Sequence, residues 1–225
     1  MIGVVTGLKS EIAVLEAAWK GDAFAYFAAG GSAARAAEAA RRMATQGATL
    51  LISAGVAGAL DPAARPGDLV LAGAVIAPDG RSYGADTAWR GKIAATLGPG
   101  ARWDAPKILG NDAAVLNVRV KADLFRRTGA VAVDMESHGL AAAAASAGIP
   151  FIVLRVIADP AERAIPEAAL AGMKPDGSVD PVAVLLRLFP TPWKLPGLLR
   201  LAAESRQAHE ALGRVALAAG RVLAG

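Results

Sequence analysis

Short runs of apolar residues recur along the chain, and stretches with helical periodicity lie between them. The predicted strands are residues 2–6, 24–29, 49–53, 68–76, 107–109, 130–133 and 151–157. Helical spacing is clear in residues 11–19, and the Ala-rich residues 33–46 and 136–147 are also predicted to be helical. This alternation predicts an α/β fold: a single domain with three αβα layers and a central mixed, largely parallel sheet.

Acidic residues follow two of these predicted strands directly. Asp134 and Glu136 come after residues 130–133, and Asp159 closes the apolar run at 151–157. In open α/β sheets, ligands bind outside the carboxyl ends of parallel strands. We therefore expect these carboxylates to line a site rather than to face solvent.

Composition and charge narrow the class of protein. A chain of 225 residues suits one domain with a sizeable core, and the absence of cysteine excludes disulfides and thiolate chemistry. The start lacks the basic flank of a signal peptide, and the uncharged stretch at residues 139–154 is interrupted by Ser146, Gly148 and Pro150. We expect a cytoplasmic protein. The net charge of +4 is scattered, which argues against nucleic-acid binding.

Several common site motifs are absent from the sequence. Residues 53–59 are predicted to form a glycine turn after a strand, but their spacing is not that of a dinucleotide-binding loop. There is no Walker A loop and no G-x-S-x-G nucleophile elbow. The two histidines show no metal-ligand pattern; His209 would be solvated, and His138 either supports the acids or packs against its helix. The sequence predicts neither a cofactor nor a metal.

Four short motifs occur in order, each near the end of a predicted strand. They are residues 7–11, residues 55–58 with 67–68, residues 133–136 and residues 155–159. Together they resemble the purine nucleoside phosphorylase superfamily, most closely its methylthioadenosine/S-adenosylhomocysteine nucleosidase-like branch. The resemblance extends from Gly3 to about Asp159, and it implies a nucleoside phosphorylase-like fold and a homo-oligomer, by analogy a homodimer.

Cleavage of a ribosyl bond to a purine has requirements that carboxyl groups can meet. The transition state resembles an oxocarbenium ion, and the purine leaves well only when an acid protonates it. The resemblance implies that Asp159 is this acid, that Glu11 contacts the attacking water and that Glu136 binds the ribose hydroxyls. Taken alone, Glu11 could be an ordinary acid in the first turn of a helix.

The resemblance also implies which residues surround the substrate. Met135 would lie against the ribose. The segment Val56, Ala57 and Gly58 would line the nucleoside pocket. Loop residues near Val115 would offer backbone contacts to the base. Asp134 has two interpretations, a substrate contact and a helix N-cap.

The chain departs from the family pattern in informative ways. The nucleosidase branch commonly has Ser or Thr at the position of Val56, and Glu at the position of Asp134. A Gly-Asp-Pro-x-x-Arg turn, which binds phosphate in the phosphorylases, is absent after the first predicted strand, where Glu11 lies instead. A carboxylate there would repel phosphate by ~1 kcal/mol or more at contact. We therefore expect water to be the nucleophile.

The C-terminal part adds an unusual apolar segment. We expect one nucleosidase-like domain over residues 1–225 with an apolar helical extension from about residue 160. Residues 182–200 combine leucines with Trp193 and Lys194, which suits peripheral contact with the inner membrane face or a channel for an apolar ligand. A dimer interface and plain core packing are the alternatives.

This tail, together with residues 134–139, resembles the hopanoid-associated phosphorylase subgroup. Such proteins are implicated in removing adenine from adenosylhopane. The resemblance therefore implies a nucleosidase that releases adenine from a nucleoside with a hydrophobic tail. The alternatives are a methylthioadenosine/S-adenosylhomocysteine salvage nucleosidase, a phosphate-dependent phosphorylase, and a non-catalytic protein that binds nucleosides or lipids.

Overall fold

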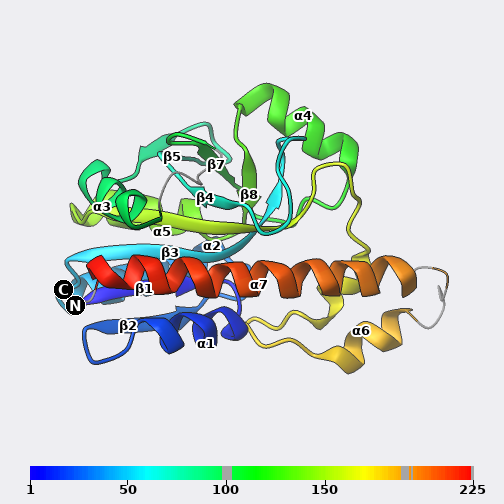
Figure 1. The fold of residues 1–225 in the computed structure, drawn as a ribbon, viewed down its shortest axis with the longest axis horizontal. Coiled ribbons are helices and arrows are strands. Elements are labelled where there is room, and N and C mark those ends of the chain that lie inside the picture. The colour runs from blue at the N-terminus through cyan, green and yellow to red at the C-terminus, as the bar shows by residue number, and fades with distance from the viewer. Residues whose placement is uncertain (98–102, 189–192, 194, 224–225) are drawn as a thin grey trace.

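One mixed sheet organises the protein. The computed structural model describes residues 1–97, 103–188, 193 and 195–223. Across these residues, nine strands form a single sheet that is flanked by helices on both faces (Figure 1). The predicted single-domain α/β fold with a central mixed sheet is confirmed.

Four parallel strands form one half of the sheet. They run in the spatial order β2 (Phe24–Ala28), β1 (Ile2–Thr6), β3 (Leu50–Ala59) and β9 (Phe151–Asp159). All nine residues of β9 are buried, as expected for an apolar run in a strand covered on both faces.

The other half is also largely parallel, but it joins the first half through antiparallel pairs. β8 (Ala132–Asp134), β7 (Lys107–Gly110) and β5 (Ala74–Ile76) are parallel neighbours, and β6 (Ser82–Gly84) pairs antiparallel with β5. β8 pairs antiparallel with β3, and β4 (Leu69–Leu71) pairs antiparallel with β9.

The pairing of β3 brings two strand ends together. β9 occupies one edge of β3, so β1 and β8 share the other edge. β1 reaches Ser53, and β8 approaches from the opposite direction and pairs with Gly58 and Ala59. Their carboxyl ends therefore point toward each other across residues 54–57. β8 therefore runs in the direction opposite to β9, which the sequence did not predict.

Two predicted element boundaries also need correction. Residues 53–59 are not a glycine turn, because β3 continues to Ala59 with a bulge between Ala57 and Gly58. The predicted strand at residues 68–76 is two strands, β4 and β5, which pair with different neighbours. The chain crosses between them at Gly73, where a Cβ atom would lie 2.7 Å from the carbonyl oxygen of Ala105.

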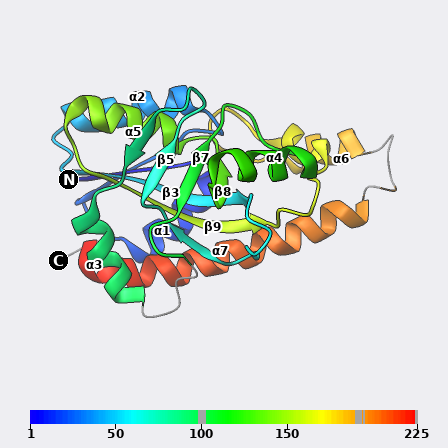
Figure 2. The ribbon, with the colours of Figure 1, turned by 90° about the horizontal axis from the view of Figure 1, so that it is seen from above.

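Small residues allow two helices to pack closely on one face of the sheet. These are α2 (Ala33–Thr45) and α5 (Ser137–Ala147), which lie together in Figure 2. A Cβ atom at Gly139 would lie 2.1 Å from the carbonyl oxygen of Ala33, so no larger residue fits there. The Ala-rich composition of both segments therefore reflects close helix packing.

Three helices cover the opposite face. They are α1 (Lys9–Ala18), α3 (Thr87–Leu97) and α7 (Leu195–Leu223), the longest of the three (Figure 2). Trp19, at the end of α1, is buried and donates a hydrogen bond from Nε1 to the carbonyl oxygen of Ala216 in α7 at 2.7 Å. α7 is thus built into the core of the domain.

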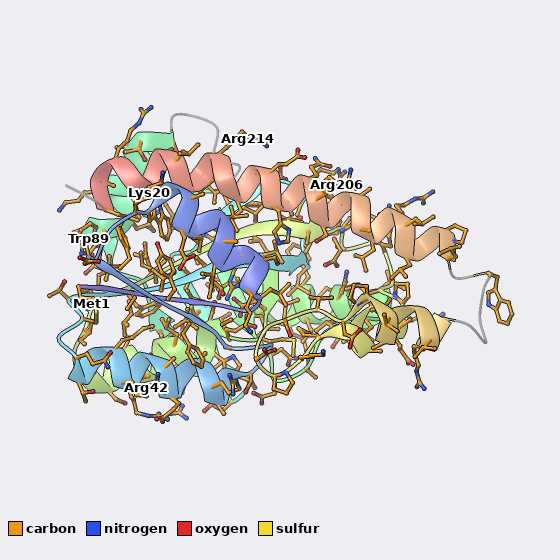
Figure 3. The ribbon with its side chains drawn as sticks, turned by 90° about the horizontal axis from the view of Figure 1, so that it is seen from below. Met1, Lys20, Arg42, Trp89, Arg206 and Arg214 are labelled. Carbon is orange, nitrogen blue, oxygen red and sulfur yellow. The ribbon has the colours of Figure 1, made fainter. Side chains whose placement is uncertain are left out.

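The C-terminal elements differ along their length. The later turns of α7 pack on the sheet through buried small and aliphatic residues: Ala208, Ala211, Leu212, Ala216, Ala219 and Leu223. The 3-10 helix η1 (Glu167–Gly172), α6 (Pro181–Leu188) and the first turns of α7 project beyond the sheet (Figure 1). Figure 3 shows Arg206 and Arg214, both exposed, along α7. None of the helices described here is long and apolar enough to cross a membrane.

Candidate active site

Glu11 is turned inward at the start of α1. Its Oε2 atom accepts hydrogen bonds from the backbone N–H groups of Gly7 (2.9 Å) and Leu8 (2.8 Å), and Oε1 accepts one from Val56 N (2.7 Å). The Val56 donor is available because β1 and β8 leave residues 54–57 uncovered on that edge of β3. Glu11 is 1% exposed, so it is more than a solvated acid in a first turn.

Two glycines make room for the carboxylates. A Cβ atom at Gly55, where φ is +144°, would lie 2.5 Å from Oε1 of Glu11. A Cβ atom at Gly7 would lie 2.8 Å from Oε1 of Glu136. The glycines of these motifs therefore permit the close approach of backbone and acid, a role that only glycine fills without strain.

Arg155 joins the acids after β8 to the sheet. It is fully buried in β9, and its Nε lies 2.7 Å from Oδ2 of Asp134. Nη2 donates to Oε2 of Glu136 at 3.1 Å and to Oγ of Ser53 at 2.8 Å. In the sequence, Arg155 has no predicted role beyond its place in a motif, although a charged residue inside a buried apolar run is a signal.

Asp134 is occupied by its own helix. Oδ1 accepts hydrogen bonds from the backbone N–H groups of Ser137 (3.0 Å) and Glu136 (3.3 Å). Oδ2 accepts one from the Ser137 hydroxyl and forms an ion pair with Nε of Arg155. The N-cap residue of α5 is Glu136, so Asp134 is not the N-cap, although its carboxylate accepts from the first N–H groups of the helix. A substrate contact of Asp134 stays a prediction.

The Glu136 carboxyl has a pKa close to neutral pH. The pKa of its carboxyl is raised from 4.5 to about 7, chiefly by burial; the charge of Arg155 lowers it, and those of Asp134 and Glu11 raise it. The cluster thus contains one cation among three buried acids, and a proton on Glu136 relieves their repulsion.

Asp159 pairs with a second buried cation. Oδ2 bonds Nζ of Lys121, which comes from α4 (Val118–Thr128) and is fully buried. Burial raises the pKa of Asp159, and the positive charge of Lys121 opposes this. Lys121 was not predicted from the sequence, because a lysine on a highly charged helix is usually solvated.

All these acids face one cavity of about 220 Å³. Every residue predicted for the site lines it: Glu11, Val56, Ala57, Gly58, Val115, Asp134, Met135, Glu136 and Asp159. Gly58 of β3 pairs with Asp159 of β9. A Cβ atom added at Gly58 would lie 3.3 Å from both carboxyl oxygens of Asp159.

The cavity also has an apolar wall that the sequence did not predict. Its residues come from the α1 turn and from the chain after β9: Leu8, Ile165, Leu170 and Met173. Two of these, Leu170 and Met173, belong to η1 and the residue after it, next to the projecting α6. The C-terminal part of the chain therefore closes one side of the site.

Neither histidine lies in this cavity. Nε2 of His138 is 3.1 Å from Oδ1 of Asp112, at a separate cavity of about 410 Å³. Nε2 of His209 is 3.2 Å from Oγ of Ser10. His138 therefore does not contact the acids, because its ring packs over Gly110 of β7 and reaches Asp112. Among the residues that the structure describes, no group of three or more His, Asp or Glu side chains is arranged for a metal ion.

The family follows from a comparison of sequences. The sequence model of the Phosphorylase superfamily matches residues 18–174, more than half of the chain. The chain belongs to this superfamily. No curated protein matches it significantly in sequence.

Solved structures of superfamily nucleosidases share the fold over almost the whole chain. The 5′-methylthioadenosine/S-adenosylhomocysteine nucleosidase from S. pneumoniae, solved with a transition-state inhibitor, is 17% identical with a TM-score of 0.70, covering 96% of this chain and 98% of that one. The enzyme from Neisseria meningitidis, in complex with methylthio-immucillin-A, is 17% identical with a TM-score of 0.69, covering 96% and 97%. The futalosine hydrolase of Helicobacter pylori is 16% identical with a TM-score of 0.68, covering 95% and 96%. At these identities, the likeness establishes the fold.

Proposed function

We propose that the protein is a nucleosidase that hydrolyses the N-glycosidic bond of an adenine nucleoside. The observation that carries the proposal is the set of three buried carboxyl groups around one small cavity, those of Glu11, Glu136 and Asp159. Each is held by different partners, so the three are suited to different tasks. A protein that only binds a nucleoside gains nothing from burying three acids, which is costly.

The contacts of Glu11 support water rather than phosphate as the nucleophile. Backbone N–H groups at a helix N-terminus ordinarily favour an anion such as phosphate. Here Glu11 accepts hydrogen bonds from Gly7, Leu8 and Val56, so its own carboxylate takes these donors. A phosphate would meet both a loss of donors and a like charge.

The remaining two acids suit the sugar and the base. Glu136 is fixed by Arg155 beside Met135, where it can accept hydrogen bonds from ribose hydroxyls. Asp159 has a raised pKa, so it can carry the proton that the purine needs to leave. The division of roles parallels that of two-carboxylate glycoside hydrolysis.

The apolar wall supports a nucleoside with an apolar 5′ substituent, for which we propose adenosylhopane. Leu170 and Met173 lie where the cavity meets the projecting C-terminal elements. A large hydrophobic tail could leave the site along this wall, because covering apolar surface with apolar surface removes both from water. Methylthioadenosine and S-adenosylhomocysteine carry smaller 5′ substituents and remain the competing substrates.

Adenine release in phosphate-free buffer tests this function. Purified protein is offered adenosylhopane, methylthioadenosine, S-adenosylhomocysteine and futalosine separately, and the free base and sugar are quantified by chromatography. We expect fastest adenine release from adenosylhopane, leaving a ribosylated hopanoid with a hydroxyl group, and no phosphate, at C1′. A phosphate requirement that yields ribose 1-phosphate identifies a phosphorylase. Faster turnover of methylthioadenosine identifies a salvage enzyme, and binding without base release identifies a binding protein.

Peripheral membrane contact through the projecting elements is part of the same proposal. Leu186 (70%), Trp193 (73%) and Leu199 (62%) are highly exposed. The sequence from residue 181 to 203 contains Arg187, Lys194 and Arg200 but no acidic residue. Residues 189–192 and 194 of the predicted contact segment lie outside the described residues. Exposed apolar side chains among cations suit an anionic lipid surface.

Vesicle flotation tests this contact. The wild type should float with phosphatidylglycerol vesicles more than with phosphatidylcholine vesicles. The double variant Leu186→Ser/Leu199→Ser should bind about 10-fold or more weakly, because two apolar anchors are lost. Leu217→Ser is the matched control, since Leu217 is 63% exposed on a later turn of α7. Equal binding of both variants would contradict the contact.

A further inference from the structure

Lys121 occupies an unusual position for a lysine. It is the buried residue of α4, and the other residues of this helix are exposed or partly exposed. Burying an ammonium group is costly unless each of its three donors finds an acceptor. α4 therefore buries Lys121 and leaves Val120 48% exposed, the reverse of the usual preference of these two residue types.

All three donors of Lys121 have acceptors near the end of β9. Nζ donates to Oδ2 of Asp159, to the carbonyl oxygen of Pro160 at 3.0 Å and to that of Arg163 at 3.1 Å. The two carbonyl groups anchor Nζ, so the ammonium holds one oxygen of Asp159 in place. No group in the described part of the chain donates a hydrogen bond to Oδ1, and Asp159 lines the cavity.

We propose that Lys121 is the positioning residue of the catalytic acid, fixing Oδ2 of Asp159 so that Oδ1 presents its proton to the departing purine. The inference rests on the proposed nucleosidase function. As the bond between C1′ and N9 breaks, its electron pair stays on the purine, and the proton on Oδ1 moves to N7. A water oxygen then bonds to C1′ and releases one proton, and Asp159 takes up a proton from solvent for the next cycle.

Burial and the charge of Lys121 have opposite effects on the pKa of Asp159. Burial raises the pKa of the Asp159 carboxyl, which keeps a proton available, while Lys121 and, less strongly, the charge of Arg163 lower it and stabilise the carboxylate left behind. An acid without Lys121 would bind its proton more tightly and release it less readily in the transition state. As the proton leaves, Asp159 becomes a carboxylate and forms a full ion pair with Lys121.

A comparison of two leaving groups tests the role of Lys121. Adenine must be protonated to leave, whereas the nitrophenolate of 4-nitrophenyl riboside leaves without a proton. Lys121→Met should lower kcat/KM for the preferred adenine nucleoside by about 10²–10³-fold and change nitrophenyl riboside hydrolysis little. The basic limb of its pH profile should move to higher pH, because the removed cation no longer lowers the pKa of Asp159. Arg126→Met, which removes an exposed cation from α4, is the control and should match the wild type.

Two further variants separate charge from packing. Lys121→Gln keeps a hydrogen-bond donor without the charge and should also move the basic limb upward. Lys121→Arg keeps the charge and should leave that limb in place. Equal losses on both substrates, or a basic limb that stays put in Lys121→Met and Lys121→Gln, would overturn the positioning role. Failure of the wild type to release base from any nucleoside would instead overturn the proposed function itself.

Discussion

Two buried cations serve the carboxyl groups of this site, and they do so differently. Arg155 spreads its nitrogens over Asp134, Glu136 and Ser53. Lys121 donates one hydrogen bond to a single acid, Asp159, and its other two hydrogen bonds to backbone carbonyl groups. The planar guanidinium suits several fixed partners at once, whereas the ammonium is a point charge.

The difference suggests which half of the site is rigid and which half handles a proton. Around Arg155, Asp134 is fully used by the arginine and by α5, so this half holds geometry. Around Lys121, one oxygen of Asp159 remains directed at the cavity, so this half can exchange a proton. The proposed roles in sugar binding and base protonation follow this division.

The largest loss of activity is expected when Asp159, whose Oδ1 faces the cavity, is replaced. Asp159→Asn should reduce adenine release by about 10²–10⁴-fold, because the amide cannot supply the proton. Adenine affinity, measured by calorimetry, should change little. Asp123→Asn, at a partly exposed acid on α4, is the control. Turnover that survives in Asp159→Asn would remove this residue from the mechanism.

Stability should distinguish the two cations. Arg155→Met leaves two buried acids without their partner and should lower the free energy of unfolding by about 3–5 kcal/mol. Lys121→Met should cost less, since Asp159 alone remains and its raised pKa lets it keep a proton. Urea denaturation at pH 7 measures both. Equal losses would mean that the two sites do not differ in rigidity.

The pH dependence of stability should expose Glu136. Its pKa in the folded state is about 7 against an ordinary 4.5, so the folded protein binds more protons in this window. The wild type should therefore lose stability relative to Glu136→Gln as the pH rises from about 4.5 to 7, by on the order of 2 kcal/mol. Asp159 titrates in both proteins and cancels. A constant difference across this range would contradict a proton on Glu136.

A small crowding effect should appear at Asp159. In Gly58→Ala, the new Cβ atom would press on both carboxyl oxygens at 3.3 Å and move them by a few tenths of an ångström. We expect about 10-fold lower kcat/KM with folding retained, because reaction rates are sensitive to such displacements. Gly91→Ala, where the added atom meets open space, is the control. Normal activity in Gly58→Ala would show that the position of Asp159 is not critical.

The sequence predicted which acids would gather but not how they meet. Apolar runs that end in Asp134 and Asp159 indicated buried strand ends, and the motif at Glu11 added the third acid. The direction of β8 could not be inferred, because three residues carry no signal for parallel or antiparallel pairing. The head-to-head arrangement of β1 and β8 therefore became visible only in the structure.

The cations were harder to predict for a physical reason. Arg155 and Lys121 are tolerable inside the protein only because distant segments bring acceptors to them. Local periodicity predicts burial from hydrophobicity, so it assigns such residues to solvent or passes over them. Gly55 and Gly58 were predicted to belong to a turn, but they lie within β3. Their role is to permit the close approach of Glu11 and Asp159 to this strand.

The carboxylate of Glu11 behaves as a permanently bound anion. It is attached to the chain, so its effective concentration at the Gly7, Leu8 and Val56 amides does not vary with conditions outside the protein. Free phosphate would have to compete with it at every level found in a cell. Under the proposed hydrolysis, cleavage would then draw only on water and would run in one direction, independent of the phosphate supply.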